Sequence, residues 1–185
     1  SLTYQGNVLH HASNGRFYIL AFDGDTFDEI WRKEINKDGS GSYNEKLPQV
    51  VIDENSNIYL SGKYVNTSNT LEYFGDYLLP QSIGTHSFGH MPFVMKLNSS
   101  GEIQWIRVPD GYTNNTAFTG VFENKGLTLN GNEIATLTNG SAHIWGDYSY
   151  TRPDSHHTDP VILRLDKDTG EVIGLHDIKG NSGTY

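Results

Sequence analysis

The chain has 185 residues, a formal net charge of −9 and no cysteine. Because it has no cluster of Lys and Arg, we do not expect it to bind nucleic acid. The absence of Cys excludes disulfides and thiolate metal sites, and no segment approaches the roughly 18 apolar residues that span a bilayer. The chain is rich in Tyr and Phe, which suit strands, and in Gly, which suits tight turns. This composition favours an all-β chain.

The first part of the chain predicts three strands: Gly6–Ala12, Phe17–Phe22 and Glu29–Ile35. Ser13-Asn14-Gly15 is an Asn-Gly type of hairpin turn, so it should pair the first two strands. Asp23-Gly24-Asp25-Thr26 turns the chain into the third strand, which carries Trp31. A polar Gly/Ser loop over Asn36–Lys46 is expected to follow.

The middle part predicts two strands, Gln49–Ile52 and Asn57–Val65, joined by a turn that begins at Asp53. The segment Asn66–Met91 is a longer excursion with room for one irregular hairpin. Phe93–Val108 closes this part with two alternating runs around a turn, and its second run carries a Trp. Alternation of apolar and polar residues is typical of half-buried strands.

The last part predicts six short strands: Phe118–Glu123, Leu127–Leu129, Glu133–Thr138, Ala142–Tyr148, Val161–Leu165 and Glu171–Ile178. Asn130-Gly131-Asn132 is another predicted hairpin turn, Asp166–Gly170 is a predicted turn, and Ser149–Asp159 is a predicted loop. No window of helical length shows helical periodicity. Short strands at regular spacing without helical patterns indicate an all-β fold.

One pattern of strand, turn and strand occurs three times, in Tyr18–Glu34, Phe93–Val108 and Val161–Ile178. The copies align on their turn residues and recur at roughly 70 residues, which indicates a repeat architecture. We therefore divide the chain into units of approximately 1–47, 48–110 and 111–185. The aligned turn residues, which we expect to cap backbone N–H groups, are Asp23, Asn98 and Asp166.

Two segments of the second unit, Asp53–Gly62 and Pro92–Trp105, resemble the β-propeller repeats of bacterial extracellular proteins, the SBBP family. The third unit keeps the outline in Asn132–Thr138 and Val161–Gly174. The resemblance implies that residues 1–185 form part of a β-propeller of antiparallel blades. It also implies an extracellular or cell-surface location.

The first and third turns also resemble the pyrroloquinoline-quinone-type propeller repeat. In the first turn the matching residues are Ala21, Asp23, Thr26 and Trp31, while Phe27 replaces a Gly. In the third turn the matching residues are Asp166, Thr169 and Gly170, while Arg164 replaces the Ala and Gly174 the Trp. The resemblance implies that Trp31 and Trp105 pack between neighbouring blades.

Propellers usually have four to eight blades, and this chain supplies between two and three units. That number cannot close a ring, and an open edge strand favours aggregation. We therefore expect either a segment of a larger propeller or copies that assemble to complete one. We favour a segment of a larger propeller, because Ser1 and Tyr185 both fall in the middle of a repeat unit.

Glu34–Glu45 fits the spacing of a calcium loop, with oxygen ligands at Glu34, Asn36, Asp38, Ser42 and Glu45. The alternative is a solvated loop between strands, because the first ligand is not Asp and no helices flank the segment. The adjacent His156 and His157 lack a convergent third ligand, so surface imidazoles are the simpler interpretation there.

Four Asn-x-Ser/Thr sequons are candidate glycosylation sites in predicted loops or turns: Asn66, Asn98, Asn114 and Asn139. Such acceptors suit the surface of a secreted glycoprotein. The tripeptide also occurs by chance in a chain this rich in Asn, Ser and Thr, so both interpretations stay open.

No catalytic or cofactor-binding motif is recognised, because the chain has neither a nucleophile elbow nor a phosphate-cradling Gly-rich loop. The hypothesis is a non-enzymatic extracellular β-propeller segment that acts as a structural or binding surface for a glycan or a protein. Its partners would include the remaining blades or further copies of the chain. Two alternatives are part of a propeller enzyme, such as a quinone-dependent dehydrogenase, and a subunit of an extracellular fibre.

Overall fold

The computed structural model describes residues 2–4, 7–9, 18–38, 49–65, 71–81, 90–112, 124–139, 143–149 and 160–178. Every regular element in these residues is a β-strand, so the prediction of an all-β chain is confirmed. Within them, no helix is present that would be long and apolar enough to cross a membrane.

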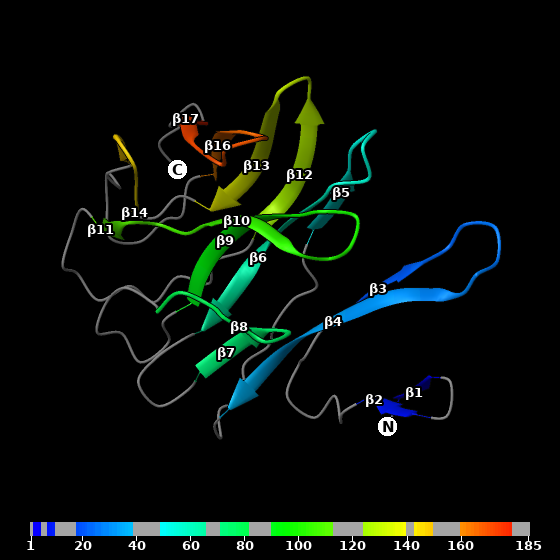
Figure 1. Cartoon of the computed structure of the whole chain (residues 1–185). Helices are drawn as coiled ribbons and strands as arrows, with labels where there is room; N and C mark the ends of the chain where they lie inside the picture. Colours follow the sequence, from blue (N-terminus) through cyan, green and yellow to red (C-terminus); the bar gives the residue numbers. More distant parts are fainter. Residues whose placement is uncertain are drawn as a thin grey trace, which may run out of the picture.

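Three four-stranded antiparallel sheets make up most of the described structure (Figure 1). The first sheet has the strand order β3 (Tyr18–Phe22), β4 (Glu29–Asp38), β7 (Leu71–Phe74) and β8 (Tyr77–Leu78). The middle sheet has the order β10 (Ile103–Arg107), β9 (His90–Leu97), β6 (Ile58–Val65) and β5 (Gln49–Ile52). The third sheet has the order β12 (Asn124–Asn130), β13 (Glu133–Asn139), β16 (Pro160–Asp166) and β17 (Val172–Asp177).

Two smaller sheets complete the described residues. One pairs β1 (Leu2–Tyr4) with β2 (Asn7–Leu9), and the other has the order β11 (Gly111–Tyr112), β14 (His143–Trp145) and β15 (Tyr148–Ser149). The sheets do not close into a barrel or a ring of blades over the residues described.

The three large sheets stack face to face and enclose two cores. The first core lies between the first and middle sheets and contains Phe74, Leu60 and Phe93, with Trp31 packed against it. The second core lies between the middle and third sheets; its buried residues are Tyr59, Val94, Ile134, Trp145, Leu163 and Leu165. Alternation along β6 sends Leu60 to one core and Tyr59 to the other. The middle sheet is thus covered on both faces.

A buried polar contact crosses the second core. The hydroxyls of Ser61 on β6 and Thr136 on β13 lie 3.1 Å apart and share a hydrogen bond. The Thr136 hydroxyl also donates to the carbonyl of Gly126, at 2.8 Å. Buried hydroxyls without partners would be costly, so this pair fixes the register between the two sheets.

Most predicted strands within the described residues are confirmed, but three predictions of pairing or extent are wrong. The strand predicted over Phe118–Glu123 lies outside the described residues. The strand predicted over Gly6–Ala12 pairs with β1 through Tyr4↔Asn7 rather than with β3, which lies at the edge of its sheet next to β4. The strand β4 does not end at Ile35, because its last four residues pair with β7. The single strand predicted over Ala142–Tyr148 is two, β14 and β15. Each difference depends on a partner strand or a turn that alternation does not specify.

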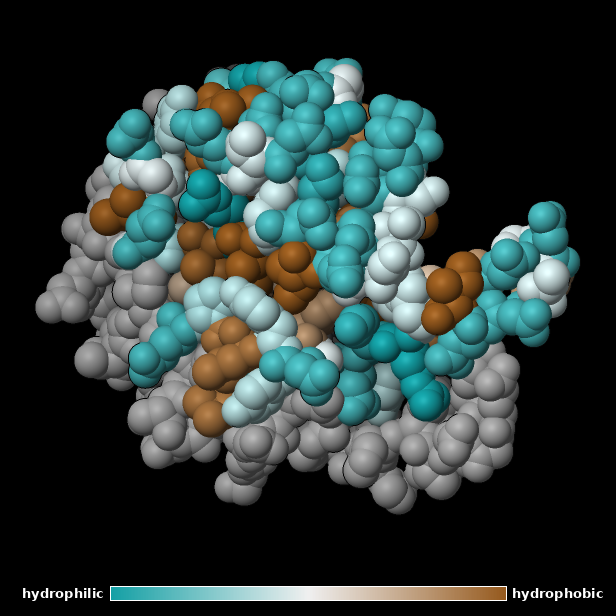
Figure 2. Space-filling model, in the orientation of Figure 1, coloured by the Kyte–Doolittle hydropathy of each residue, from teal (hydrophilic) through white to brown (hydrophobic). Residues whose placement is uncertain are grey.

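Three two-residue hairpin loops begin with a glycine of positive φ: Gly75, Gly131 and Gly146 have φ of 58°, 58° and 59°. Each is the first central residue of a two-residue loop, the position that a type II′ turn reserves for Gly. The hairpin turn predicted at Asn130-Gly131-Asn132 is therefore confirmed. The β3–β4 hairpin extends beyond the other sheets in Figure 1, and Figure 2 shows mostly hydrophilic residues at its end.

Candidate functional site: the joints between sheets

The first and third of the turns that align the repeats share one backbone pattern. The carboxylate oxygen Oδ1 of Asp23 accepts hydrogen bonds from the N–H groups of Asp25 and Thr26, at 2.9 and 2.8 Å. In the third repeat, Oδ1 of Asp166 accepts the equivalent bonds from Asp168 and Thr169, also at 2.9 and 2.8 Å. Hydrogen bonds from the N–H groups of Thr26 and Thr169 lower the pKa of the respective carboxyl.

The remaining aligned turn uses an amide instead. Oδ1 of Asn98 accepts from the N–H groups of Ser100 and Glu102, at 3.0 and 2.9 Å, and its Nδ2 donates to Glu102 Oε2 at 2.7 Å. The side chain of this sequon residue is thus already engaged in the turn. The other three sequon side chains, at Asn66, Asn114 and Asn139, lie outside those that the structure describes.

A fourth turn, between β5 and β6, depends on Asp53. Its Oδ1 accepts from the N–H groups of Asn55 and Asn57, and its Oδ2 accepts from Asn57 Nδ2 and from the Tyr59 hydroxyl at 3.0 Å. Desolvation raises the pKa of Asp53, but hydrogen bonds from Asn57, Tyr59 and Asn55 outweigh it, so this pKa is lowered. Burial, followed by the bond to Asp53, raises the pKa of Tyr59.

Acid should weaken these turns. The folded-state pKa values of Asp23, Asp53 and Asp166 lie below the value of about 3.9 for an unfolded chain. Their contribution is therefore present above about pH 4 and is lost as the pH falls through the folded pKa values. Urea unfolding at about pH 6 and about pH 3 should show a lower free energy of unfolding in acid. Asp53→Asn should make this loss smaller; an equal loss in the variant would contradict the assignment.

The first joint between sheets is made by Trp31 of the first sheet and the β9–β10 turn of the middle sheet. Trp31 Nε1 donates to the carbonyl of Ser99 at 2.7 Å. The indole lies flat on Gly101, where a Cβ would come within 2.8 Å of Trp31 Cδ2. Gly101 has φ of 76°, so glycine is favoured at this position both by the backbone and by the ring above it.

The second joint repeats the first between the middle and third sheets. Trp105 Nε1 donates to the carbonyl of Lys167 at 3.3 Å, and a Cβ on Gly170 would lie 2.6 Å from Trp105 Cδ2. Arg107 Nε donates to the carbonyl of Gly170 at 2.7 Å. On the same side of the middle sheet, Lys96 Nζ lies 3.2 Å from Asp168 Oδ1 of the third sheet. Each Trp therefore docks on the turn of the next repeat.

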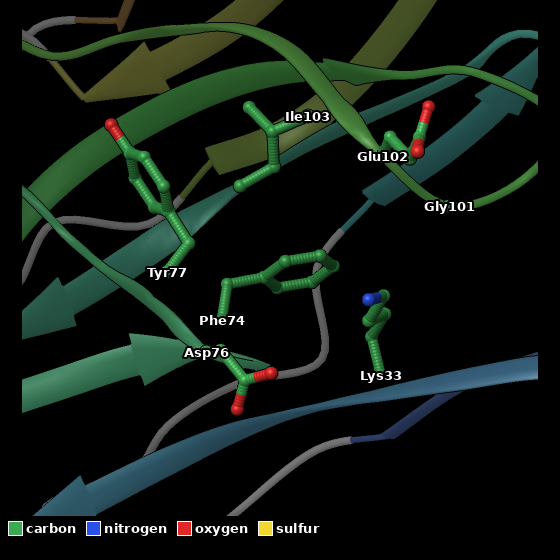
Figure 3. A pocket seen from close by; sticks show the side chains of 7 residues that line it. All are labelled: Lys33, Phe74, Asp76, Tyr77, Gly101, Glu102 and Ile103. Atoms are coloured by element: carbon green, nitrogen blue, oxygen red, sulfur yellow. The ribbon is translucent and has the colours of Figure 1, made fainter.

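A pocket of about 280 Å³ opens at the first joint. Its lining residues come from β4, from the β7–β8 hairpin and from the β9–β10 turn: Lys33, Phe74, Asp76, Tyr77, Gly101, Glu102 and Ile103. Figure 3 shows Phe74 between Lys33 and Ile103, with Tyr77 at one side and Glu102 at the other. The ring of Tyr77 is 43% exposed, whereas Phe74 is buried and forms the floor.

The second joint carries the same chemistry at equivalent positions. Phe74-Gly75-Asp76-Tyr77 corresponds to Trp145-Gly146-Asp147-Tyr148, and Lys33 and Gly101 stand at the positions of Arg107 and Gly170. There the space is occupied differently: Trp145 is buried in the second core, and the Tyr148 hydroxyl donates to the carbonyl of Ile173 at 3.1 Å. The smaller residues of the first joint, Phe for Trp and Lys for Arg, leave the pocket open.

The sequence prediction singled out Trp31 and Trp105 but not the residues that surround them. Lys33 and Arg107 follow each Trp by two positions, on the same face of the strand. The repeated aromatic-Gly-Asp-Tyr sequence of the two hairpins was the signal that could have revealed the rest. It was missed because the hairpins lie inside the longer excursions that interrupt the repeats.

The predicted calcium loop is not a single loop. Glu34, Asn36 and Asp38 lie in β4, while Ser42 and Glu45, like His156 and His157, lie outside the described residues. Among the side chains that the structure does describe, no group of three or more His, Asp or Glu is placed to hold a metal ion.

Comparison with known proteins adds no assignment to this geometry. The chain matches no protein-family model, and it matches no curated protein significantly.

Proposed function

We propose that the chain is a segment of an extracellular β-propeller that serves as a non-enzymatic structural and ligand-binding module. The observation that carries this proposal is the repeated joint, in which a Trp of one four-stranded sheet docks on a Gly turn of the next. Sheets that are packed face to face in chain order, each contacting only its neighbours, are the units of propellers and other repeat proteins.

The ligand surface is the pocket at the first joint. The exposed ring of Tyr77 offers an apolar face, and the carboxylates of Asp76 and Glu102 offer hydrogen-bond acceptors. The cavity is slightly smaller than the pockets that bind drug-sized ligands, which have volumes of about 300 Å³ or more. These features suit one hydroxyl-bearing ring, such as a neutral or amino sugar at the end of a glycan.

The two alternatives have less support. The turn that resembles quinone-dependent dehydrogenases is accounted for by its part in the joints, where Asp166 orders the backbone and Gly170 receives Trp105. A fibre subunit would pair its open edge strands, and no contact within the described part of the chain favours that over face-to-face stacking.

Sugar binding can be measured by NMR titration with glucose, galactose, N-acetylglucosamine and glucosamine at millimolar concentrations. We expect saturable shifts that localise to the first joint. Tyr77→Ala should weaken binding about fivefold, because aromatic packing contributes about 1 kcal/mol. Tyr148→Ala is the matched control, since this Tyr occupies the equivalent position in the second joint. Equal weakening by both variants, or no saturable shift with any sugar, would contradict the pocket as the ligand site.

A further inference from the structure

The two ends of the stack of sheets carry the joint residues in altered form. In register, Trp31 faces Ala21, Trp105 faces Lys96, and Gly174 faces Arg164 across the final hairpin of each repeat. The third sheet therefore has a glycine where the other two have a Trp. In the first turn, Phe27 donates its N–H to the Asp23 carbonyl at 2.9 Å, as Gly170 does to the Asp166 carbonyl. Phe27 thus stands where the joint requires a glycine.

Phe27 combines strain with exposure. Its φ is 60°, a region that non-glycine residues avoid, and its side chain is 76% exposed. The same hairpin also exposes Phe22 and Ile30. A large aromatic side chain held outward in a strained backbone is an outlier that indicates function, because neither folding nor solubility favours it.

The outer side of the third sheet presents the flat guanidinium of Arg164, which is ion-paired with Glu133. Leu163 and Leu165 point into the second core, so Arg164 between them lies on the opposite side of the sheet. The Arg164 guanidinium is fixed by Glu133, with Nη2–Oε1 at 2.6 Å and Nε–Oε2 at 2.9 Å, and its Nη1 lies 3.3 Å from His176 Nε2. A Cβ on Gly174 would lie 3.2 Å from this imidazole. A planar guanidinium held in this way is a good surface for an aromatic ring.

One ion pair of the second joint has a counterpart at the two ends. The first turn carries Asp23, Asp25 and Asp28, and the outer side of the third sheet carries Arg164, which is paired with Glu133, and His176. The second joint shows the same relation within one chain. There Lys96, opposite Trp105, pairs with Asp168, and the equivalent residues at the ends are Arg164 and Asp25.

We propose that two copies of the chain associate head to tail, with Phe27 of each copy packed on Arg164 above Gly174 of the other. The inference rests on the proposed propeller. The described residues of each copy form three stacked four-stranded sheets, the first of which takes β7 and β8 from the second repeat. Two copies joined at both ends would place six such sheets in one ring, within the usual four to eight blades. Two copies would therefore close one ring through two equal joints, as cyclic symmetry requires. The missing Trp of the third sheet is replaced by an aromatic ring from the opposite side of the joint.

Sedimentation equilibrium of the whole chain at micromolar concentrations tests this contact. We expect twice the chain mass of 20.7 kDa. Phe27→Ala should raise the dimer dissociation constant at least about tenfold, as for a central aromatic anchor. Ile52→Ala, which truncates another exposed side chain on β5, is the control and should leave the mass unchanged. A monomer at every concentration, or an unchanged dimer in Phe27→Ala, would overturn the contact, and a series of larger species would overturn the closed ring.

A reciprocal exchange tests the geometry. Phe27→Gly and Gly174→Trp should each favour the monomer, whereas the double variant rebuilds the Trp–Gly joint found twice within the chain and should restore the dimer. Failure of the double variant, with both singles folded by circular dichroism, would overturn the docking of Phe27 above Gly174. The sugar titration at Tyr77 is independent of this contact. A sugar-binding monomer would therefore refute only the dimer, while a dimer without sugar binding would refute only the pocket.

Discussion

Trp105→Ala is expected to lower the free energy of unfolding by about 3 kcal/mol, the lower end of the range for Trp→Ala in a packed core, because Trp105 is partly buried. The substitution removes the indole from above Gly170, removes the hydrogen bond to the Lys167 carbonyl and leaves Tyr59 without its aromatic neighbour, whose ring centroid is 6.3 Å away. Because the third sheet meets the middle sheet at this joint, we expect it to unfold separately. Urea unfolding followed by circular dichroism should then show two transitions.

Two controls separate the joint from general packing. Trp105→Phe keeps an aromatic ring but loses the indole donor. We therefore expect this variant to lose about 1 kcal/mol of unfolding free energy, the contribution of one hydrogen bond. Ile52→Ala removes a side chain that is 62% exposed, and such surface changes stay within about 0.5 kcal/mol. If Trp105→Ala cost no more than Ile52→Ala, the Trp joint would not be what holds the sheets together.

Gly170→Ala should be nearly as damaging, for a different reason. The added methyl would lie 2.6 Å from Trp105 Cδ2 and 2.8 Å from Cε3, so the indole must leave its position. The residue also has φ of 70°, at which a side chain is strained by about 1–2 kcal/mol. We expect a total loss of about 3 kcal/mol in urea unfolding, together with a changed Trp fluorescence spectrum.

Gly131→Ala isolates the backbone part of this effect. Gly131 has φ of 58°, but no atom lies within 4 Å of the position that its Cβ would take. This variant should therefore lose only the backbone strain, about 1–2 kcal/mol, with unchanged fluorescence. Equal losses in the two variants would show that contact between Gly170 and Trp105 contributes nothing beyond the turn conformation.

Local patterns were sufficient wherever an element is determined by its own residues. The strands β5, β6 and β13 follow from alternation, and the turn at Gly131 follows from a short run of turn residues. The repeat also singled out Trp31 and Trp105 before any contact was known, because a Trp at a similar distance after the turn in two copies indicates a shared role.

These local patterns do not predict which strands far apart in the sequence pair with one another. The β7–β8 hairpin joins β4 of the preceding repeat through Ile35↔Phe74, and nothing in either segment specifies that partner. In the sequence, Lys33 and Arg107 are simply polar positions within predicted strands, with no sign of a site. Only the stacking of sheets brings Lys33 to the pocket and Arg107 to the Gly170 carbonyl.

Residue patterns alone were thus enough to predict an all-β chain and to suggest three related units, the positions of their turns and the Trp residues that distinguish them. These properties depend on periodicity and on turn chemistry, which act over a few residues. Only the tertiary structure shows which strand completes which sheet and which turn each Trp docks on. It also shows that Phe27 and Gly174 depart from the other joints. These features depend on contacts between residues about one repeat apart. The sequence around one partner of such a contact does not indicate which residue is the other.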